Sequence, residues 1–537
     1  MKKIRKTLSF LLAICMLLSM TACGGTAGNG AEGTTFAPTG SADTEAGTPE
    51  EAGQPASESG SSTLRIGLDG EPPSLSSTET MGTNGAQFVG YCLYDTCWRT
   101  NTNGNTTMLL ADDYTVADDN STITVHLRDN ACFSNGDPVT AEDVLFSMKV
   151  NDSMMGDQTA SFDLDASYAQ DEKTLVVAVK APTPAMTKQL GSVLVMSKSW
   201  TEDFTNEDHI YTNILSSGPY MLAQDWSTGN TMYLTKNPYY HSADTLAYEN
   251  LECYFVGEEN TRYLSFQNNE YDICYLTDSA NIESVKADTS RSLFSAPAEF
   301  VAGLIWNTYS EDSPFKNNNL RLAMCYAVDV PTIIESICGS AYIPATSFMP
   351  SSSWAYKNTA YGYDPELAQE YFDKYKAETG ADGFEFTVTV NDSDINNGLV
   401  EAIQYYYSTI GITMNIESVD MATYFGFLMD DSLYCTITQY SGSGDPGSIL
   451  NSWLSTSIYE LQKTNDTIMP LLDEGANSMG SQEERTKILF QVQDLMKDYA
   501  PILPLYETTI NYALASSDVD ISESVMGDGY LFPQNIK

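Results

Sequence analysis

The fold is decided by the stretch LRDNACFSNGDPVTAEDV, residues 127–144. Over residues 122–128 apolar and polar side chains alternate, which is the period-two pattern of a strand with one buried face. The run Gly136-Asp137-Pro138 is typical of a turn. Thr140 is then placed to cap a helix, and Asp143 stands at the third helical position for the reciprocal contact. The stretch therefore predicts a strand, a turn and a capped helix in immediate succession.

The same reasoning predicts further elements on both sides of this stretch. Asp364-Pro365-Glu366 is expected to begin one helix, and Ser481 with Glu484 forms the capping box of another. Further strands are expected at 64–68, 174–179, 232–235, 384–390 and 412–419. Strands and helices alternate irregularly, and no repeat indicates a solenoid or propeller. The expected fold class is α/β with mixed sheets.

Length and charge exclude some classes of protein. A chain of 537 residues is too long for one compact core. It has 26 basic and 72 acidic residues, a formal net charge of −46. Nucleic-acid binding is not expected, because it depends on Lys and Arg displacing counterions from phosphates. The acidity favours solubility outside the cell, and an acid-lined site for cations is the less favoured reading.

The N-terminus predicts export. Residues 1–22 combine a basic start with a short apolar run and read as a signal peptide. Met20-Thr21-Ala22-Cys23 resembles a bacterial lipobox, so Cys23 is the predicted lipidation site, carrying a fatty acid such as palmitate. The alternative is a plain signal peptide with an incidental cysteine. Residues 23–62 are poor in apolar side chains and are expected to be a flexible linker.

The sequence gives little support for catalysis or metal binding. It contains three histidines, and we find no nucleophile elbow, zinc helix or phosphate loop. The acidic run from Asp112-Asp113 to Asp118-Asp119-Asn120 lacks calcium-loop spacing, and a β-turn before the strand at 121 is the better account. Eight cysteines follow Cys23, at 92, 97, 132, 253, 274, 325, 338 and 435, without metal-ligand spacing. We expect no catalytic residue, metal or cofactor; buried thiols are the default, and disulfides remain open.

Several short segments, taken in their order along the chain, resemble one known family. Residues 127–144 match its signature almost position for position. Weaker matches are Gly70-Glu71-Pro72-Pro73-Ser74-Leu75, Ser217-Gly218-Pro219-Tyr220, Lys236-Asn237-Pro238-Tyr239-Tyr240, Trp306-Asn307-Thr308, and Arg321-Leu322-Ala323 with Ala327-Val328-Asp329. From about Leu64 to the C-terminus the chain resembles the bacterial extracellular solute-binding proteins of family 5, the peptide and nickel class, which includes oligopeptide- and dipeptide-binding lipoproteins of ABC transporters.

The resemblance implies a two-lobed fold like that of periplasmic binding proteins, with the solute held between the lobes. The first lobe would be large and discontinuous, with an extra subdomain, and would hold residues 64–298 plus 507–537. The second lobe would hold residues 299–506. The two chain crossings, near 299–305 and 502–506, would form the hinge. Closure of such a hinge excludes water, so that a few polar contacts can hold a solute.

The resemblance also implies a function and a site. The chain would capture a short peptide and pass it to an ABC permease, as a monomer anchored through Cys23 on the extracytoplasmic face of the cell membrane. The implied ligand-binding residues are Tyr94, Trp98, Trp306, Asn307, Tyr440, Ser441, Ser443 and Asp445. Core packing is the alternative reading for Trp306 and Tyr440, and a turn residue before proline is the alternative for Asp445.

The sequence departs from the family at one position. Peptide-binding relatives hold the α-amine of the ligand with an Asp at the position that Gly442 occupies here. Either Asp445 or another acid replaces it, or the solute has no free α-amine. Alternative solutes are therefore an oligosaccharide or a metal chelate. A sensory lipoprotein with the same fold, and less favourably a surface hydrolase, also remain open.

Overall fold

The predicted strand, turn and capped helix are present. Strand β5 (Thr122–Leu127) buries alternate residues, and helix α3 (Ala141–Met154) follows it. The N–H of Thr140 donates to Asp143 Oδ2 over 2.9 Å, and the N–H of Asp143 donates to Thr140 Oγ1 over 3.3 Å. Gly136 in the turn has φ +89°, a left-handed conformation that glycine adopts without strain.

The computed structural model describes residues 62–77, 80, 83–100, 106–154, 157–199, 214–420, 423–424, 426–427, 433–441, 445–454, 466–525 and 530–537. The predicted signal peptide 1–22 and Cys23 lie outside these residues, as do Gly442 and Ser443. The folded part forms one compact unit by its internal contacts, Ser61–Lys537.

A small antiparallel sheet contains β5 and has the order β4-β5-β7-β6. Its other strands are β4 (Ala111–Val116), β6 (Phe162–Ala169) and β7 (Thr174–Val179). With α3 and α4 (Met186–Gly191) it encloses a separate hydrophobic core that runs from Cys97 to Val195. The β-turn predicted before the strand at 121 is present, because the N–H of Asn120 donates to the carbonyl oxygen of Ala117 over 2.8 Å and Asn120 has φ +57°. The earlier acidic residues Asp112 and Asp113 lie within β4.

Within the described residues, the largest sheet has nine strands in the order β16-β12-β17-β11-β1-β10-β9-β8, with β13 beside β17. Their bounds are β1 (Thr63–Leu68), β8 (Tyr220–Leu222), β9 (Met232–Lys236), β10 (Asn250–Phe255), β11 (Ile273–Leu276), β12 (Ser292–Trp306), β13 (Tyr342–Pro344), β16 (Cys435–Ser441) and β17 (Ile502–Leu514). Strand β1 is parallel to β10 and β11, whereas the remaining pairs are antiparallel. The mixed sheet predicted from the sequence is therefore confirmed.

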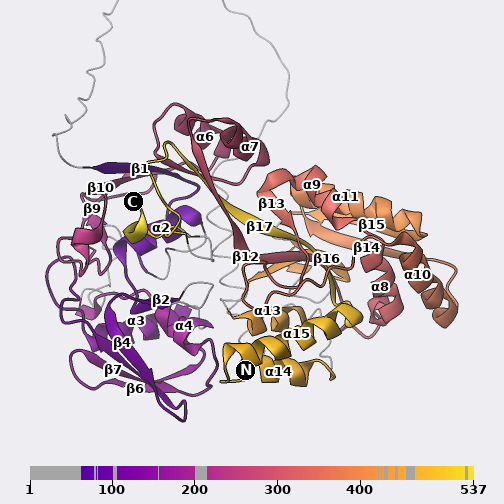
Figure 1. Ribbon diagram of the computed structural model, residues 1–537, viewed down its shortest axis with the longest axis horizontal. Helices are drawn as coiled ribbons and strands as arrows, with labels where there is room; N and C mark the ends of the chain where they lie inside the picture. The colour runs from indigo at the N-terminus through magenta and orange to yellow at the C-terminus, as the bar shows by residue number, and fades with distance from the viewer. Residues whose placement is uncertain are drawn as a thin grey trace, which may run out of the picture. The chain divides into compact units, whose positions relative to one another are not determined.

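Strands β12 and β17 lie side by side along most of their length, as Figure 1 shows. Their register shifts between Pro297 and Val301 and again between Ala302 and Gly303, as β-bulges do. The hydrophobic cores change at the same place. One core contains Ala298, Ile510 and Tyr512, and another runs from Val301 to Tyr506. The two strands thus join separately packed parts of the chain, and the bulges lie where they pass from one to the other.

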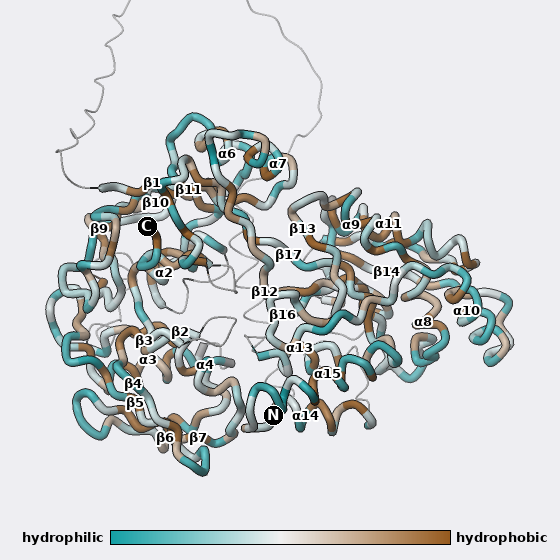
Figure 2. The backbone as a smooth tube through the Cα atoms, in the orientation of Figure 1, coloured by the Kyte–Doolittle hydropathy of each residue, from teal (hydrophilic) through white to brown (hydrophobic). Residues whose placement is uncertain are grey.

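The core from Val301 to Tyr506 is built around the parallel pair β14 (Phe384–Asn391) and β15 (Ile412–Val419) and the strand β16. Its helices are α8 (Asn318–Tyr326), α9 (Val330–Cys338), α10 (Pro365–Thr379), α11 (Asp394–Thr409), α13 (Pro446–Leu454), α14 (Met469–Asn477) and α15 (Gln482–Tyr499). Figure 2 shows hydrophobic stretches alternating with hydrophilic ones along these helices. Asp364 caps α10 and Ser481 forms a capping box with Glu484 in α15, as predicted.

The core that contains Ala298 and Tyr512 is covered by α2 (Asn84–Leu93) and by the C-terminal residues Ile521, Leu531 and Ile536. Helices α6 (Glu259–Gln267) and α7 (Ser279–Ala287) pack with β11 around a smaller core. Within the described residues, no single helix has the length and apolarity of a membrane span; one pair bent by 55°, Asn318–Tyr326 with Val330–Ala341, passes by length and composition only.

Candidate functional site

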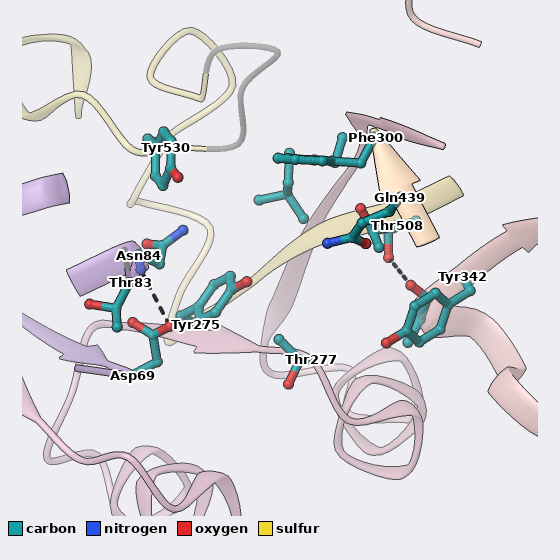
Figure 3. A pocket seen from close by; sticks show the side chains of 14 residues that line it. Asp69, Thr83, Asn84, Tyr275, Thr277, Phe300, Tyr342, Gln439, Thr508 and Tyr530 are labelled. Atoms are coloured by element: carbon teal, nitrogen blue, oxygen red, sulfur yellow. Dashed lines mark hydrogen bonds between the residues drawn. The ribbon is translucent and has the colours of Figure 1, made fainter. Parts of the chain in front are cut away.

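A cavity of about 340 Å³ lies beside the paired strands β12 and β17, which both contribute residues to its wall. It is lined by Asp69, Thr83, Asn84, Tyr275, Thr277, Ala298, Phe300, Ala341, Tyr342, Gln439, Thr508, Thr509, Ile510 and Tyr530. These residues belong to both separately packed parts of the chain: Ala298 and Ile510 pack in one core, while Tyr342 packs against the other. Figure 3 shows Asp69, Asn84, Tyr275 and Tyr530 on one side of the cavity and Phe300, Gln439, Thr508 and Tyr342 on the other.

The start of helix α2 fixes the acidic side of the cavity. Asp69 Oδ1 accepts a hydrogen bond from the N–H of Gly85 at 2.8 Å, and Oδ2 accepts one from the N–H of Asn84 at 3.3 Å. Thr83 is the N-cap and accepts from the N–H of Ala86. The first N–H groups of a helix have no partner inside the helix, and the helix dipole favours a negative charge there. The carboxylate of Asp69 is thus held in place by backbone donors.

Aromatic side chains form much of the remaining wall. Burial, with a smaller contribution from Asp69, raises the pKa of Tyr275, so this phenol remains protonated and neutral. Burial also raises the pKa of Tyr342, with smaller effects of Cys338 and Glu259. The ring of Tyr342 lies edge-on to that of Tyr506 with centroids 4.8 Å apart. Such a wall offers apolar faces for stacking and hydroxyl groups for hydrogen bonds.

The remaining polar groups are neutral and are held in position by their neighbours. The hydroxyl of Thr509 donates to the carbonyl oxygen of Ala341 over 2.7 Å, and the hydroxyl of Thr277 donates to Glu259 over 2.6 Å. Gln439 extends from β16, where it pairs with Ala302 of β12. Amide and hydroxyl groups in these positions suit the main-chain groups of a polar solute.

Glu507 lies on β17 next to the cavity-lining Thr508. Its carboxylate is buried and accepts hydrogen bonds from the N–H and the hydroxyl of Ser351, at 2.8 and 2.7 Å. Burial raises the pKa of Glu507, although the two Ser351 donors oppose this effect. This acid therefore contacts the loop before α10 and is not among the residues that line the cavity.

The aromatic site residues implied for the first lobe lie in hydrophobic cores. Tyr94 is buried, and its hydroxyl donates to the carbonyl oxygen of Leu75 over 2.7 Å. Trp98 is buried, stacks on Tyr114 at 4.3 Å and donates its indole N–H to the carbonyl oxygen of Thr187. Their polar atoms are thus satisfied within the protein, and neither residue lines the cavity.

The same holds for Trp306 and Asn307 in the second part of the chain. The indole N–H of Trp306 donates to the carbonyl oxygen of Ala500 over 2.8 Å, which fits the core-packing alternative. The amide of Asn307 donates to the carbonyl oxygen of Leu433 and accepts from the backbone of the following turn. Both residues fasten the end of β12, and a role of either in contacting a solute stays a prediction.

The four remaining predicted site residues follow one another on and after β16. Tyr440 is half-buried and lies edge-on to Trp453, with ring centroids 4.6 Å apart. Ser441 ends β16, and Ser443 lies outside the described residues. Asp445 forms a buried ion pair with Arg485, with Oδ2 and Nη2 2.7 Å apart. It also accepts from the N–H of Gly447 at the start of α13. Asp445 therefore already has a countercharge.

Sequence reasoning missed all the residues that line the cavity. Gln439 precedes the predicted Tyr440, and because side chains alternate along a strand the two point to opposite faces of β16. Asp69 immediately precedes the matched segment 70–75, which begins one residue too late to include it. No sequence signal relates Tyr275, Tyr342 and Tyr530, since Tyr275 and Tyr342 lie on different strands of the sheet and Tyr530 lies in the C-terminal segment outside it.

The described cysteines are unpaired thiols, of which Cys132 is half-buried and the others are buried. Burial raises the pKa of several of them, for example that of Cys338 to about 11. In the described ranges, no cluster of three or more His, Cys, Asp or Glu is arranged to hold a metal ion.

Comparison with known proteins gives consistent results. The family model described as bacterial extracellular solute-binding proteins, family 5 middle, matches residues 105–460, more than half of the chain. The oligopeptide-binding protein OppA of Bacillus subtilis (strain 168) is 23% identical over 557 aligned residues, which cover 94% of each chain.

Solved structures share the fold. The ABC transporter substrate-binding protein CtaP of Listeria monocytogenes has a TM-score of 0.76 at 21% identity, covering 88% of this chain and 99% of that one. The dipeptide-binding protein of Pseudoalteromonas sp. SM9913, solved in complex with Met-Leu, has a TM-score of 0.70 at 17% identity, covering 88% and 99%. These likenesses confirm the predicted two-lobed, periplasmic-binding-protein-like fold class.

Proposed function

The chain belongs to the bacterial extracellular solute-binding proteins of family 5, and from this membership we propose that it is the solute-binding component of an ABC transporter. In this proposal it captures a short peptide between its two lobes and delivers the peptide to a membrane permease. The family consists of solute-binding proteins, so the proposed mechanism is binding and release without bond chemistry.

The observation that carries the proposal is the composition of the cavity. Its walls come from both separately packed parts of the chain and combine aromatic rings with hydroxyl and amide groups. A peptide has alternating main-chain donors and acceptors together with side chains of varied polarity. Hydroxyls and amides can meet the former, and aromatic faces can meet the latter. Similarity to proteins named for oligopeptide and dipeptide binding supports the same choice.

Closure would take place at the paired crossings of β12 and β17. The register shifts between Pro297 and Gly303 interrupt the regular ladder of hydrogen bonds there. A strand bends more readily at such an interruption than in a continuous ladder. In the proposed mechanism residues 64–298 with 507–537 move against residues 299–506, and the cavity walls approach each other around the solute.

Location and assembly are proposed from the sequence and the family. An extracellular family implies a site of action outside the cytoplasm. We place the protein on the outer face of the cell membrane, tethered by a lipid on Cys23 through the linker 23–62. It would act there as a monomer that meets its permease in the membrane.

The test is calorimetric titration of the purified protein with a panel of dipeptides and tripeptides. A maltooligosaccharide and an iron chelate represent the alternative solutes. We expect saturable binding of peptides with dissociation constants in the micromolar range or below, and none of the other solutes. Gln439→Ala should weaken this binding, whereas Tyr405→Ala, at a side chain 68% exposed outside the cavity, should not.

Three other results would contradict the proposal. Binding of only the carbohydrate or the chelate would replace the solute class. Recovery of cleaved peptide after incubation would indicate a hydrolase. Unchanged peptide uptake by cells that lack the protein, despite peptide binding in solution, would favour the sensory alternative.

A further inference from the structure

One ionisable acid lines the cavity without a matching base. Among the described lining residues Asp69 is the only one with a charged side chain at neutral pH, and none is Lys or Arg. The two hydrogen bonds to its carboxylate come from uncharged backbone N–H groups. These bonds fix the carboxylate oxygens of Asp69, but within the described residues no cation compensates the negative charge of this carboxylate.

Arg262, which contacts the backbone of Tyr275, is already paired with an acid. Arg262 donates to the carbonyl oxygen of Tyr275 over 3.0 Å. Its guanidinium also lies 3.5 Å from Glu259, with side chains 2% and 13% exposed. Arg262 is therefore paired with Glu259 and hydrogen-bonded to the backbone of Tyr275. It does not face the cavity.

The other buried acids in this region are also committed. Asp445 pairs with Arg485 at 2.7 Å, and Glu507 accepts from Ser351. A cation that entered the cavity would meet neither carboxylate among the lining residues. Asp69 is thus the one described carboxylate that an incoming positive charge can reach within this cavity.

Two tyrosine rings lie on the same side of the cavity as Asp69. Tyr275 is close enough for Asp69 to affect its pKa, and Tyr275 and Tyr530 also interact electrostatically. Figure 3 shows both rings on the side of the cavity where Asp69, Thr83 and Asn84 lie. Protonated phenols present electron-rich faces, which attract an ammonium or guanidinium group. The far side, with Gln439, Thr508 and Tyr342, offers neutral groups and no cation for a carboxylate.

From these contacts we infer that Asp69, with Tyr275 and Tyr530, binds the positively charged end of the solute, so that the protein selects peptides with a free amino group and is indifferent to a blocked carboxyl group. This inference rests on the proposed peptide-binding function and names the chemical group that the cavity recognises. It makes Asp69 the acid that compensates for glycine at position 442.

The experiment compares three sets of the same dipeptides by competition in native mass spectrometry and by calorimetry. The sets are unmodified Ala-Phe, Lys-Phe and Ala-Ala, their N-acetyl derivatives, and their C-terminal amides. Loss of one partner of a desolvated charge pair costs about 2 kcal/mol or more, which is about 30-fold in affinity. We therefore expect N-acetylation to weaken binding about 30-fold or more, and amidation to leave it unchanged or stronger.

A variant assigns the effect to the residue. Asp69→Asn retains one side-chain carbonyl oxygen to accept from the N–H of Gly85 and should remain folded. It should lose about 30-fold in affinity for the unmodified peptides and little for the acetylated ones. Asp129→Asn removes the same charge at an exposed position of the same lobe and should leave both affinities unchanged.

The outcomes separate this inference from the proposed function. Equal binding of free and acetylated peptides by the unaltered protein overturns the inference and leaves the function in place, and this comparison does not depend on any variant. Full affinity of Asp69→Asn for unmodified peptides has the same consequence. Absence of binding of every peptide overturns the proposed function and the inference together.

Discussion

Asp445 illustrates how much of a residue's role depends on its partner. From the sequence it could anchor a solute or end a turn, whereas the structure gives it Arg485 as an ion-pair partner, with side chains 9% and 7% exposed. The guanidinium also donates to the carbonyl oxygen of Gly475 over 2.9 Å. The pair therefore joins the start of α13 to α14 and α15.

Removing one charge of this pair should reduce stability rather than solute selection. A buried charge left without its partner costs about 3–5 kcal/mol. We expect Asp445→Asn to lower the free energy of unfolding by about this amount, measured by urea denaturation. Its preference for free-amine over acetylated peptide should match that of the unaltered protein.

The matched control is Asp382→Asn, which neutralises an exposed acid in the same lobe and should change stability by less than about 0.5 kcal/mol. Normal stability of Asp445→Asn combined with loss of the amine preference would instead make Asp445 the anchor and displace Asp69.

For single residues, the sequence indicates which segments lie near the cavity but not which way each side chain points. Trp306 and Tyr440 were predicted to bind the solute, and they lie on the paired strands β12 and β16. The sequence could not decide which face of a strand points into the cavity, because a shift of one residue reverses every side chain. Gln439 lines the cavity and Tyr440 packs on Trp453 for this reason.

At the scale of elements, prediction succeeded where a local contact fixes the start. The reciprocal bonds of Thr140 with Asp143 and of Ser481 with Glu484 involve residues three apart, and both were predicted. Strands β7 and β15 were also predicted with their observed bounds. The bulges between β12 and β17 could not be predicted, because they depend on how two segments about 200 residues apart in the chain are paired.

The first turn of helix α2 packs so closely against the backbone of Gly70 that Gly85 has no room for a side chain. A Cβ atom there would lie 2.2 Å from the carbonyl oxygen of Gly70. Gly70 directly follows Asp69, whose carboxylate accepts from the N–H of Gly85. Gly85→Ala must therefore push the helix and the Asp69 loop apart.

We expect Gly85→Ala to lower the free energy of unfolding by about 1–3 kcal/mol, as overpacking of a close contact does. It should also reduce affinity for free-amine peptides, because the carboxylate of Asp69 loses its fixed position. Thermal denaturation and calorimetry measure the two effects. Gly426→Ala, where a Cβ would meet nothing within 4 Å, is the control and should show neither. Wild-type affinity in Gly85→Ala would mean that the placement of Asp69 does not matter for binding.

At the scale of the whole molecule, the dominant electrostatic fact is the net charge of −46. Like charges repel one another across the folded surface and lower its stability, and the same field attracts cations toward the protein. Salt screens both effects, with a Debye length of about 30 Å at 0.01 M and about 8 Å at 0.15 M. Stability and cation capture should therefore respond to salt in opposite directions.

We expect the melting temperature to rise by a few °C, on the order of a few kcal/mol, when NaCl is raised from about 10 to about 150 mM. Over the same range the association rate of Lys-Lys, followed by tryptophan fluorescence in stopped flow, should fall several-fold, whereas that of the net-neutral Ala-Ala should stay nearly constant. Repeating the series with tetramethylammonium chloride controls for specific binding of sodium. Equal salt dependence of the two association rates would contradict long-range attraction of cations. That attraction is separate from the local contact at Asp69, so the acetylation experiment at high salt tests the amine preference independently of it.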